Sequence, residues 1–230
     1  ANKNIPIRIG VNSGSLEKNI LAKYNGITAE GMRDSALYHA SLLEKFDFDN
    51  IVISIKSSNV ETMVKAYRLT SQSCDYPLHL GVTEAGTERM GLIKSSIGIG
   101  SLLLDGIGDT IRVSLTADPV KEVYAGIDIL KAVGLYNKGV NIVSCPTCGR
   151  TKIDLIKLAG QVEDALRDCD KNIKVAVMGC AVNGPGEARD ADIGIAGGDN
   201  CGLIFKKGEI IKKVPQDKLL EELLLQINEL

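Results

Sequence analysis

The stretch IVISIKSSNVETMVKAYRLTSQS, residues 51–73, contains in one place the pattern that decides the fold. Residues 51–55 are rich in isoleucine and valine, as in a strand that is buried on both faces. A polar turn follows, and residues 60–73 then show the apolar spacing of a helix. A strand followed directly by a helix is typical of a βα unit on a parallel sheet.

The same order of strand and helix recurs on both sides of this stretch. Asp118 and Pro119 suit the start of the last helix, and Gly134 suits its end. A closed barrel of this type needs about eight βα units, so the units found here are either an open α/β sheet or part of a barrel. The strands are predicted at 5–11, 51–55, 78–82 and 110–115, and the helices at 28–46, 60–73, 88–104 and 118–133.

The pattern changes near residue 139, where we expect a second, smaller domain of α+β type. A helix is predicted at 153–167 and an amphipathic helix at 216–230, whose leucines favour a place in the core. The dipeptide Lys207-Gly208 suits a two-residue hairpin turn. The strands of this domain are predicted at 174–178, 193–196, 203–206 and 209–213.

Composition excludes several classes of function. The 230 residues include 27 basic and 29 acidic side chains, a net charge of −2, so no overall field attracts nucleic acid or a membrane surface. The chain has no tryptophan and only three phenylalanines, which argues against a surface for stacking bases. We see no apolar run of about 18 residues and no leader segment, and therefore expect a cytoplasmic protein without nucleic-acid or membrane partners.

Three cysteines and a glutamate form the main candidate for a metal centre. Cys145 and Cys148 lie in a turn with Pro146, and Cys180 follows 32 residues later, shortly before Glu187. This spacing favours an iron–sulfur cluster, because zinc would prefer a second cysteine pair or a histidine pair nearby. Zinc and unmetallated thiols stay open as alternatives. From spacing alone, the fourth ligand is Cys169, Cys201, a carboxylate or none.

Four long motifs carry a resemblance to a known family: IRIGVNSGSL at 7–16, LGVTEAG at 80–86, CPTCGRT at 145–151 and GCAVNGPGEAR at 179–189. Together they resemble the hydroxymethylbutenyl diphosphate synthase family of isoprenoid biosynthesis. The resemblance implies a reductive ring opening and dehydration of 2-C-methyl-D-erythritol 2,4-cyclodiphosphate. It also implies a TIM-type (β/α)8 barrel followed by a domain with a [4Fe-4S] cluster.

We expect the chain to depart from that family pattern in one respect, by lacking the first half of the barrel. We therefore expect residues 1–138 to be the C-terminal half of the barrel, which binds the diphosphate of the substrate. Residues 139–230 are expected to be the α+β iron–sulfur domain. On this interpretation the chain is a fragment of an iron–sulfur oxidoreductase, and it is not expected to turn over substrate alone.

The resemblance and the strand positions together give candidate site residues. Arginine offers a fork to phosphate, and lysine a point charge, at the strand ends where barrels bind ligands. The alternatives without a role in binding are surface ion pairs and solvated side chains. The expected substrate-binding residues are Arg8, Asn12, Lys56, Arg112 and Ser114; the catalytic residues are Glu84, as proton donor to the departing hydroxyl, and Glu187; the metal ligands are Cys145, Cys148, Cys180 and Glu187.

The resemblance also implies partners. Flavodoxin or ferredoxin is the expected electron donor, and a head-to-tail homodimer is the expected assembly. His39 and His79 are interpreted as packing residues, since a lone histidine is more often structural than catalytic. The competing hypothesis is a non-enzymatic zinc- or cluster-binding module.

Overall fold

The computed structural model describes residue 3 and residues 5–230, and it divides the chain into two compact units. The N-terminal unit is Ala1–Tyr136 and the C-terminal unit is Asn137–Leu230. Each has its own hydrophobic core, so each is described by itself. None of the helices formed by the described residues has the length and apolar character needed to cross a membrane.

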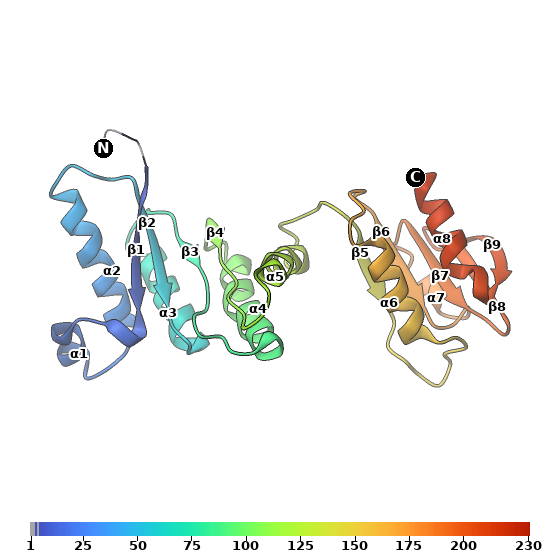
Figure 1. Ribbon diagram of the computed structural model, residues 1–230, viewed down its shortest axis with the longest axis horizontal. Coiled ribbons are helices and arrows are strands. Elements are labelled where there is room, and N and C mark those ends of the chain that lie inside the picture. The colour runs from blue at the N-terminus through green and yellow to red at the C-terminus, as the bar shows by residue number, and fades with distance from the viewer. Residues whose placement is uncertain (1–2, 4) are drawn as a thin grey trace. The chain divides into compact units, whose positions relative to one another are not determined.

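The N-terminal unit is a succession of βα units with parallel strands (Figure 1). Strand β1 pairs with β2 and β3 pairs with β4, and a bridge between Ile53 and Leu78 joins the two pairs. The α/β fold expected for a partial barrel is therefore confirmed. Its elements are β1 (Ile7–Asn12), α1 (Lys18–Tyr24), α2 (Ala29–Glu44), β2 (Ile51–Lys56), α3 (Val60–Ser71), β3 (His79–Leu80), α4 (Glu88–Leu104), β4 (Thr110–Ile111) and α5 (Pro119–Ala132), with a 3-10 turn at Ser13–Ser15.

The two faces of these strands differ in chemistry. Ile53, Ile55 and Leu80 are fully buried in one cluster with apolar residues of α2, α3 and α4. Because side chains alternate along a strand, the residues between them point to the opposite face. We call that face the inner face; its polar residues are Arg8, Asn12, Ser54, Lys56, His79, Thr110, Arg112 and Ser114.

Tyr67 of α3 ties the strands together from the helix side. It is fully buried, its hydroxyl accepts the N–H of Ile55 at 2.8 Å, and the same hydroxyl donates to the carbonyl oxygen of His79. Burial raises the pKa of Tyr67 to about 12, so the hydroxyl keeps its proton. One side chain thus fixes the backbones of β2 and β3.

The C-terminal unit is a five-stranded mixed sheet in the order β5-β6-β7-β8-β9 (Figure 1). The first three strands are parallel, and β8 and β9 form an antiparallel hairpin through Lys207 and Gly208, both with positive φ. Its elements are β5 (Asn141–Ser144), α6 (Leu155–Leu166), β6 (Lys174–Met178), α7 (Gly184–Glu187), β7 (Ile193–Gly197), β8 (Cys201–Lys206), β9 (Glu209–Pro215) and α8 (Leu219–Asn228), with a 3-10 turn at Gln216–Lys218.

Both faces of this sheet are covered. On one face, α6 and α8 bury a cluster that includes Val162, Ile195 and Leu223. On the other face, a smaller cluster around Phe205 includes Ala188, which directly follows α7. The short segment around α7 is therefore held against the sheet.

The predicted elements agree with the structure where the pattern was long. The helix at 88–104 and the strand at 174–178 have the predicted bounds, and Asp118 caps α5 by accepting the N–H of Val120 at 2.9 Å. The strand predicted at 110–115 was too long, because it ends at Ile111. The helix predicted at 216–230 begins only at Leu219.

Three elements were not predicted: α1, β5 and α7. Helix α1 buries none of its residues, so it has no apolar stripe to detect. Strand β5 has only four residues, and Asn141 and Ser144 at its ends are exposed. Helix α7 is a single turn.

Candidate functional site

The inner face of the N-terminal unit carries three cations from different strands. Arg8 comes from β1, Lys56 ends β2, and Arg112 directly follows β4. The pKa of Lys56 is lowered by burial and then by the positive charges of Arg112 and Arg8. None of the three forms an ion pair with a residue that the structure describes. This concentration of positive charge is suited to an anionic ligand.

Arg112 is held in place by its neighbours. Its Nε–H donates to Ser114 Oγ at 3.2 Å, and Nη2–H donates to the carbonyl oxygen of Val82 at 3.5 Å. A Cβ on Gly81 would lie 2.9 Å from Cζ of Arg112, so the guanidinium can lie against β3 only because residue 81 is glycine. Its Nη1 is buried and has no hydrogen-bond partner among residues 3 and 5–230.

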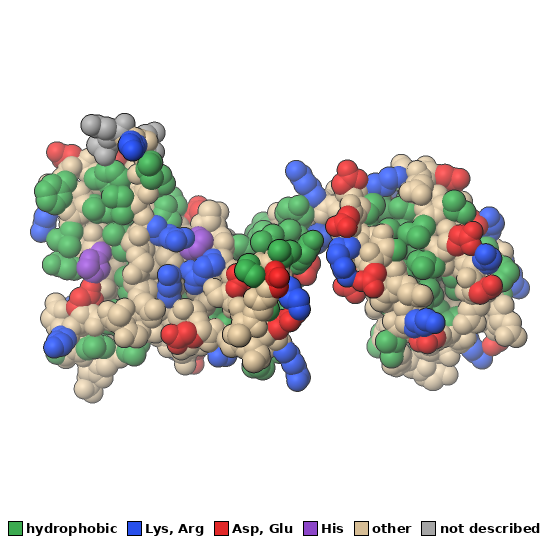
Figure 2. Space-filling view, viewed as in Figure 1, with side chains coloured by type: hydrophobic (Ala, Val, Ile, Leu, Met, Phe, Trp, Pro, Cys, Tyr) green, Lys and Arg blue, Asp and Glu red, His purple; other side chains and the backbone are tan. Residues whose placement is uncertain are grey.

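His79 lies among the same cations. Burial lowers its pKa to about 4, and the charges of Arg8, Arg112 and Lys56 contribute in the same direction. Its Nδ1 is 2.8 Å from Thr110 Oγ1. In the space-filling view, Lys and Arg side chains gather beside a histidine in this unit (Figure 2). The place of His79 among these cations could not be predicted from the sequence; the register pairs it with Thr110, two residues before Arg112, so it shares the face of Arg112.

Asn12 and Glu84 lie at strand ends, as barrel site residues do. Asn12 is opposite Lys56 in the register of β1 and β2, and its Oδ1 accepts the N–H of Gly14 at 3.0 Å. Glu84 is exposed, in the loop between β3 and α4, with φ of 49°. A glutamate in this region of φ is uncommon, and such strain clusters at functional sites.

Two of the predicted metal ligands follow neighbouring parallel strands in the C-terminal unit. Cys145 directly follows β5, and Cys180 comes two residues after β6. The backbone N–H of Gly179 donates to Cys145 Sγ at 3.1 Å. Because the carboxyl ends of adjacent parallel strands meet at one edge, these two thiols belong to the same edge of the sheet.

Cys148 lies in the exposed turn after Cys145. Its backbone N–H donates to Thr151 Oγ1 at 3.2 Å, and its carbonyl oxygen accepts the N–H of Thr151 at 3.0 Å. A backbone hydrogen bond from Arg150 is the main cause that lowers the pKa of the Cys148 thiol. A lowered pKa favours the thiolate, which is the form that binds metals.

Glu187 ends helix α7, seven residues after Cys180. Its Oε1 accepts the Nδ2–H of Asn183 at 3.2 Å, and its carboxylate is exposed. The N–H of Gly184 donates to the carbonyl oxygen of Cys180 at 3.1 Å, which joins the helix to the cysteine. A Cβ on Gly184 would lie 2.8 Å from Met178 Cβ, so this segment lies directly on the end of β6.

Cys145 and Cys180 share one edge of the sheet, but the four donors are not gathered into a coordination shell. Among the described residues, no three His, Cys, Asp or Glu side chains are arranged to hold a metal ion, and all six cysteines are free thiols. The donor chemistry nevertheless fits an iron–sulfur cluster, since thiolates are its usual ligands and Cys145 Sγ already accepts an N–H bond, as cluster sulfurs do.

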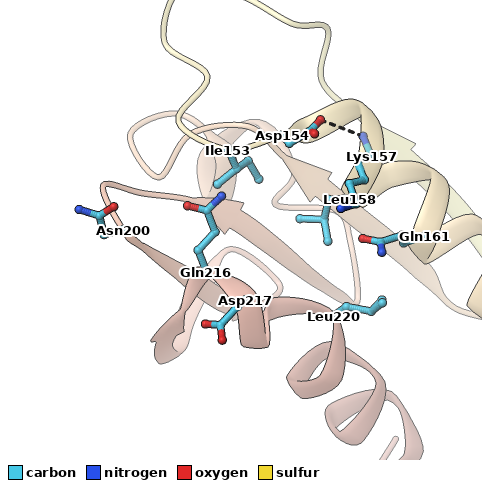
Figure 3. A pocket seen from close by; sticks show the side chains of 9 residues that line it. All are labelled: Ile153, Asp154, Lys157, Leu158, Gln161, Asn200, Gln216, Asp217 and Leu220. Carbon is cyan, nitrogen blue, oxygen red and sulfur yellow. Dashed lines mark hydrogen bonds between the residues drawn. The ribbon is translucent and has the colours of Figure 1, made fainter.

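A separate pocket of about 550 Å³ lies in the C-terminal unit at the start of α6 and α8 (Figure 3). Asp154 caps α6 there, accepting the N–H of Lys157 at 3.2 Å. None of the four predicted metal ligands lines it. Its lining residues are Ile153, Asp154, Lys157, Leu158, Gln161, Asn200, Gln216, Asp217 and Leu220.

Family models match nearly the whole chain. Residues 1–127 match the model described as the GcpE TIM-barrel domain, and residues 141–229 match the GcpE protein C-terminal domain. The two matches fall on the N-terminal and C-terminal units in turn. The barrel part of the α/β fold is therefore a partial TIM barrel.

Similar proteins carry a common name, 4-hydroxy-3-methylbut-2-en-1-yl diphosphate synthase (flavodoxin). The protein of Clostridium acetobutylicum is 66% identical over 226 residues, 98% of this chain and 65% of that protein. The protein of Clostridium perfringens is 65% identical over 222 residues, 96% of this chain and 64% of that protein. The chain thus spans about 64% of the length of such relatives. On these matches, the chain belongs to the GcpE family.

Proposed function

We propose that this chain supplies the diphosphate-binding half-barrel and the metal domain of a 4-hydroxy-3-methylbut-2-enyl diphosphate synthase. The observation that carries the proposal is the group of cations on the inner face, which form no ion pair with the residues that the structure describes, in a chain 65% identical to a protein of that name. The whole reaction converts 2-C-methyl-D-erythritol 2,4-cyclodiphosphate by reductive ring opening and loss of water. It belongs to a protein of the relatives' length, and the 230 residues alone are expected to be inactive.

The cations hold the diphosphate in this proposal. Arg8 and Arg112 offer guanidinium forks to phosphate oxygens, and Lys56 adds a point charge. Asn12 and Ser114 contribute neutral hydrogen bonds from the ends of their strands. As the ring opens, negative charge develops on the diphosphate, so these groups stabilise the transition state electrostatically rather than covalently.

Glu84 is proposed as the proton donor to the departing hydroxyl. Its loop directly follows β3, at the end of the strands where barrels bind substrates. The positive φ of Glu84 holds the residue in a conformation that the chain would otherwise avoid. A carboxyl group presented beside the anion site can give its proton as water leaves.

Cys145, Cys148, Cys180 and Glu187 are proposed to hold a [4Fe-4S] cluster. When bound, such a cluster would pass single electrons from an external donor to the substrate. The three thiols favour iron and sulfide, whereas the exposed carboxylate of Glu187 is a harder and more exchangeable ligand. Glu187 therefore also belongs among the residues proposed to act in catalysis.

The partners proposed for the whole protein follow from the relatives. Their name contains flavodoxin, which we propose as the electron donor of this protein, with ferredoxin as the alternative. A head-to-tail homodimer and a cytoplasmic location complete the proposal.

The decisive experiment is a chimera. The matching 222 residues of the Clostridium perfringens relative are replaced by this chain, and the product is purified without oxygen. We expect about four iron and four sulfide per chain and conversion of the cyclodiphosphate with reduced flavodoxin. The matched control is the chimera with Cys180→Ser. A chimera that carries the cluster but gives no product contradicts the proposed function, and stoichiometric zinc without sulfide favours a zinc-binding module instead.

A further inference from the structure

His79 is a buried histidine with one satisfied and one unsatisfied ring nitrogen. The residue is 9% exposed, and its Nδ1 is 2.8 Å from Thr110 Oγ1. Its Nε2 is buried and has no hydrogen-bond partner in the part of the chain that the structure describes. Buried polar atoms are nearly always hydrogen-bonded, so an unpaired ring nitrogen calls for a ligand or a water molecule.

One further unpaired atom lies on the same face of the strands. Arg112 Nη1 is buried and, among the described residues, has no partner. His79 comes from β3 and Arg112 follows β4, so the two atoms come from two neighbouring strands. A polar ligand on the inner face would satisfy both. Because guanidinium nitrogens only donate, that ligand must offer acceptor oxygens.

The surroundings of His79 determine its protonation. Arg8, Lys56 and Arg112 make a second positive charge unfavourable, so the imidazole is neutral near pH 7. In a neutral imidazole one nitrogen carries hydrogen and the other accepts. If the hydroxyl of Thr110 donates to Nδ1, the hydrogen is on Nε2, the nitrogen without a partner.

The backbone of His79 is fixed independently of any ligand. Its carbonyl oxygen accepts the hydroxyl of Tyr67, which is fully buried. Strand β3 is therefore held from the helix side, and the ring of His79 needs only Thr110 to set its orientation. A donor that is already oriented loses little entropy when a ligand binds.

We propose that His79 is a substrate-binding residue whose neutral Nε2–H donates to a phosphate oxygen of the diphosphate held by Arg8, Lys56 and Arg112, with Thr110 fixing the tautomer. The inference rests on the proposed function, because that function supplies the diphosphate. It adds an uncharged ring donor to a site that, in the proposed function, combines three cations with the neutral groups of Asn12 and Ser114. His79 would thus distinguish the direction of an oxygen lone pair, which a point charge does not.

Nitrogen NMR on the chain labelled in histidine tests the tautomer and the contact together. The chain has only two histidines, so His39, on α2, provides the internal control. At pH 7 we expect the His79 signals of a neutral ring with hydrogen on Nε2. Saturating inorganic diphosphate should shift the Nε2 signal of His79 and leave that of His39 in place.

Two substitutions test the same contact by binding, measured by calorimetry with inorganic diphosphate. In His79→Gln the side-chain amide reaches about as far as Nε2, so the affinity should stay within about threefold. In His79→Asn the amide reaches only the position of Nδ1, so Thr110 keeps its partner and the donor to the anion is lost. A lost bond to a charged acceptor corresponds to about 10- to 100-fold weaker binding. His39→Gln is the matched control and should bind as the unchanged chain does.

The outcomes separate the inference from the proposed function. If the unchanged chain binds diphosphate and His79→Asn binds equally well, or the His79 signals do not move, the role of His79 is wrong while the anion site stands. If the unchanged chain binds no diphosphate, the anion site itself is wrong and this inference falls with it. Weaker binding by His79→Asn, with near-normal binding by His79→Gln, supports the inference.

Discussion

The two units prepare their candidate sites in different ways. In the N-terminal unit, Arg8, Lys56 and His79 are in or at the ends of strands, so the backbone holds them in one group before any ligand binds. In the C-terminal unit, Cys148 and Glu187 lie in a turn and at the end of a one-turn helix, and the donors are not gathered. The difference indicates that the proposed anion site would be preformed by the sheet, whereas the proposed metal site would need its metal to bring the donors together.

The largest expected effect concerns the metal site. Cys180→Ser removes the one buried thiol of the proposed donor set. After anaerobic reconstitution we expect about four iron in the unchanged chain and less than half of that in the variant. Cys169→Ser, half-buried in the same unit, is the control and should keep its iron. Equal loss in both variants would mean that reconstitution reports folding rather than ligation.

The next effect concerns the preformed anion site. Arg112→Met removes the cation that Gly81 and Ser114 hold in place, and the affinity for inorganic diphosphate should fall about 10- to 100-fold by calorimetry. Arg89→Met, at an exposed position on α4, should leave the affinity unchanged. If the two variants lose affinity equally, binding reflects total charge and not a site, and the comparison between the units fails.

A third prediction tests how the inner face is held. Tyr67→Phe leaves the N–H of Ile55 and the carbonyl oxygen of His79 without their buried partner, which should cost about 1–3 kcal/mol of the free energy of unfolding. Urea unfolding followed by NMR signals of each unit measures the cost. The signals of the C-terminal unit should not change.

The control for Tyr67→Phe is Tyr76→Phe, whose hydroxyl bonds to the exposed carboxylate of Glu44 at 2.6 Å. That substitution should cost less than about 1 kcal/mol, because water replaces the lost partner. A larger cost for Tyr76→Phe than for Tyr67→Phe would show that the buried bridge does not hold the strands.

The smallest effect is a dependence on pH. The unfolded chain protonates His79 near pH 6.5, whereas in the folded chain its pKa is about 4. Between these values the unfolded state binds more protons than the folded state. The contribution of His79 to the free energy of unfolding is therefore complete above pH 6.5 and is lost as the pH falls toward 4. We expect the free energy of unfolding of the N-terminal unit to fall by about 1–2 kcal/mol from pH 7 to pH 5 on this account.

Two histidine substitutions test whether His79 causes this dependence on pH. His79→Gln should remove the loss of unfolding free energy between pH 7 and pH 5, since glutamine does not titrate. His39→Gln should not change that loss. The measurement is urea unfolding of the three proteins at pH 7 and pH 5. If all three lose the same stability, burial of His79 among cations is not the cause.

Long helices with a regular apolar pattern could be predicted from the sequence. The neighbours of a single side chain in the folded protein could not. The helix at 88–104 was found because seventeen residues share one pattern and an acidic first turn. His79 was interpreted as a packing residue, and its place beside Arg8 and Arg112 could not be predicted because those residues are far away in the chain. Only the register, in which His79 pairs with Thr110, places it on the inner face.

The proposed metal ligands show a different limit. The sequence offers candidates, since Cys145 and Cys148 lie in a distinctive turn and the motif at 179–189 is long. Their assembly could not be predicted, because β5 is too short to show a pattern and α7 is a single turn. Loops take their final positions from the partner that they bind, and that information is not in local sequence.

Asn12 would give the proposed anion site a hydrogen bond whose direction is set by the backbone. An amide can normally present either its oxygen or its nitrogen to a ligand. Here the oxygen already accepts the N–H of Gly14, and this bond orients the amide. In the proposed site the NH2 group would then donate to phosphate oxygens, so a backbone hydrogen bond two residues further along the chain would set the orientation of a ligand contact.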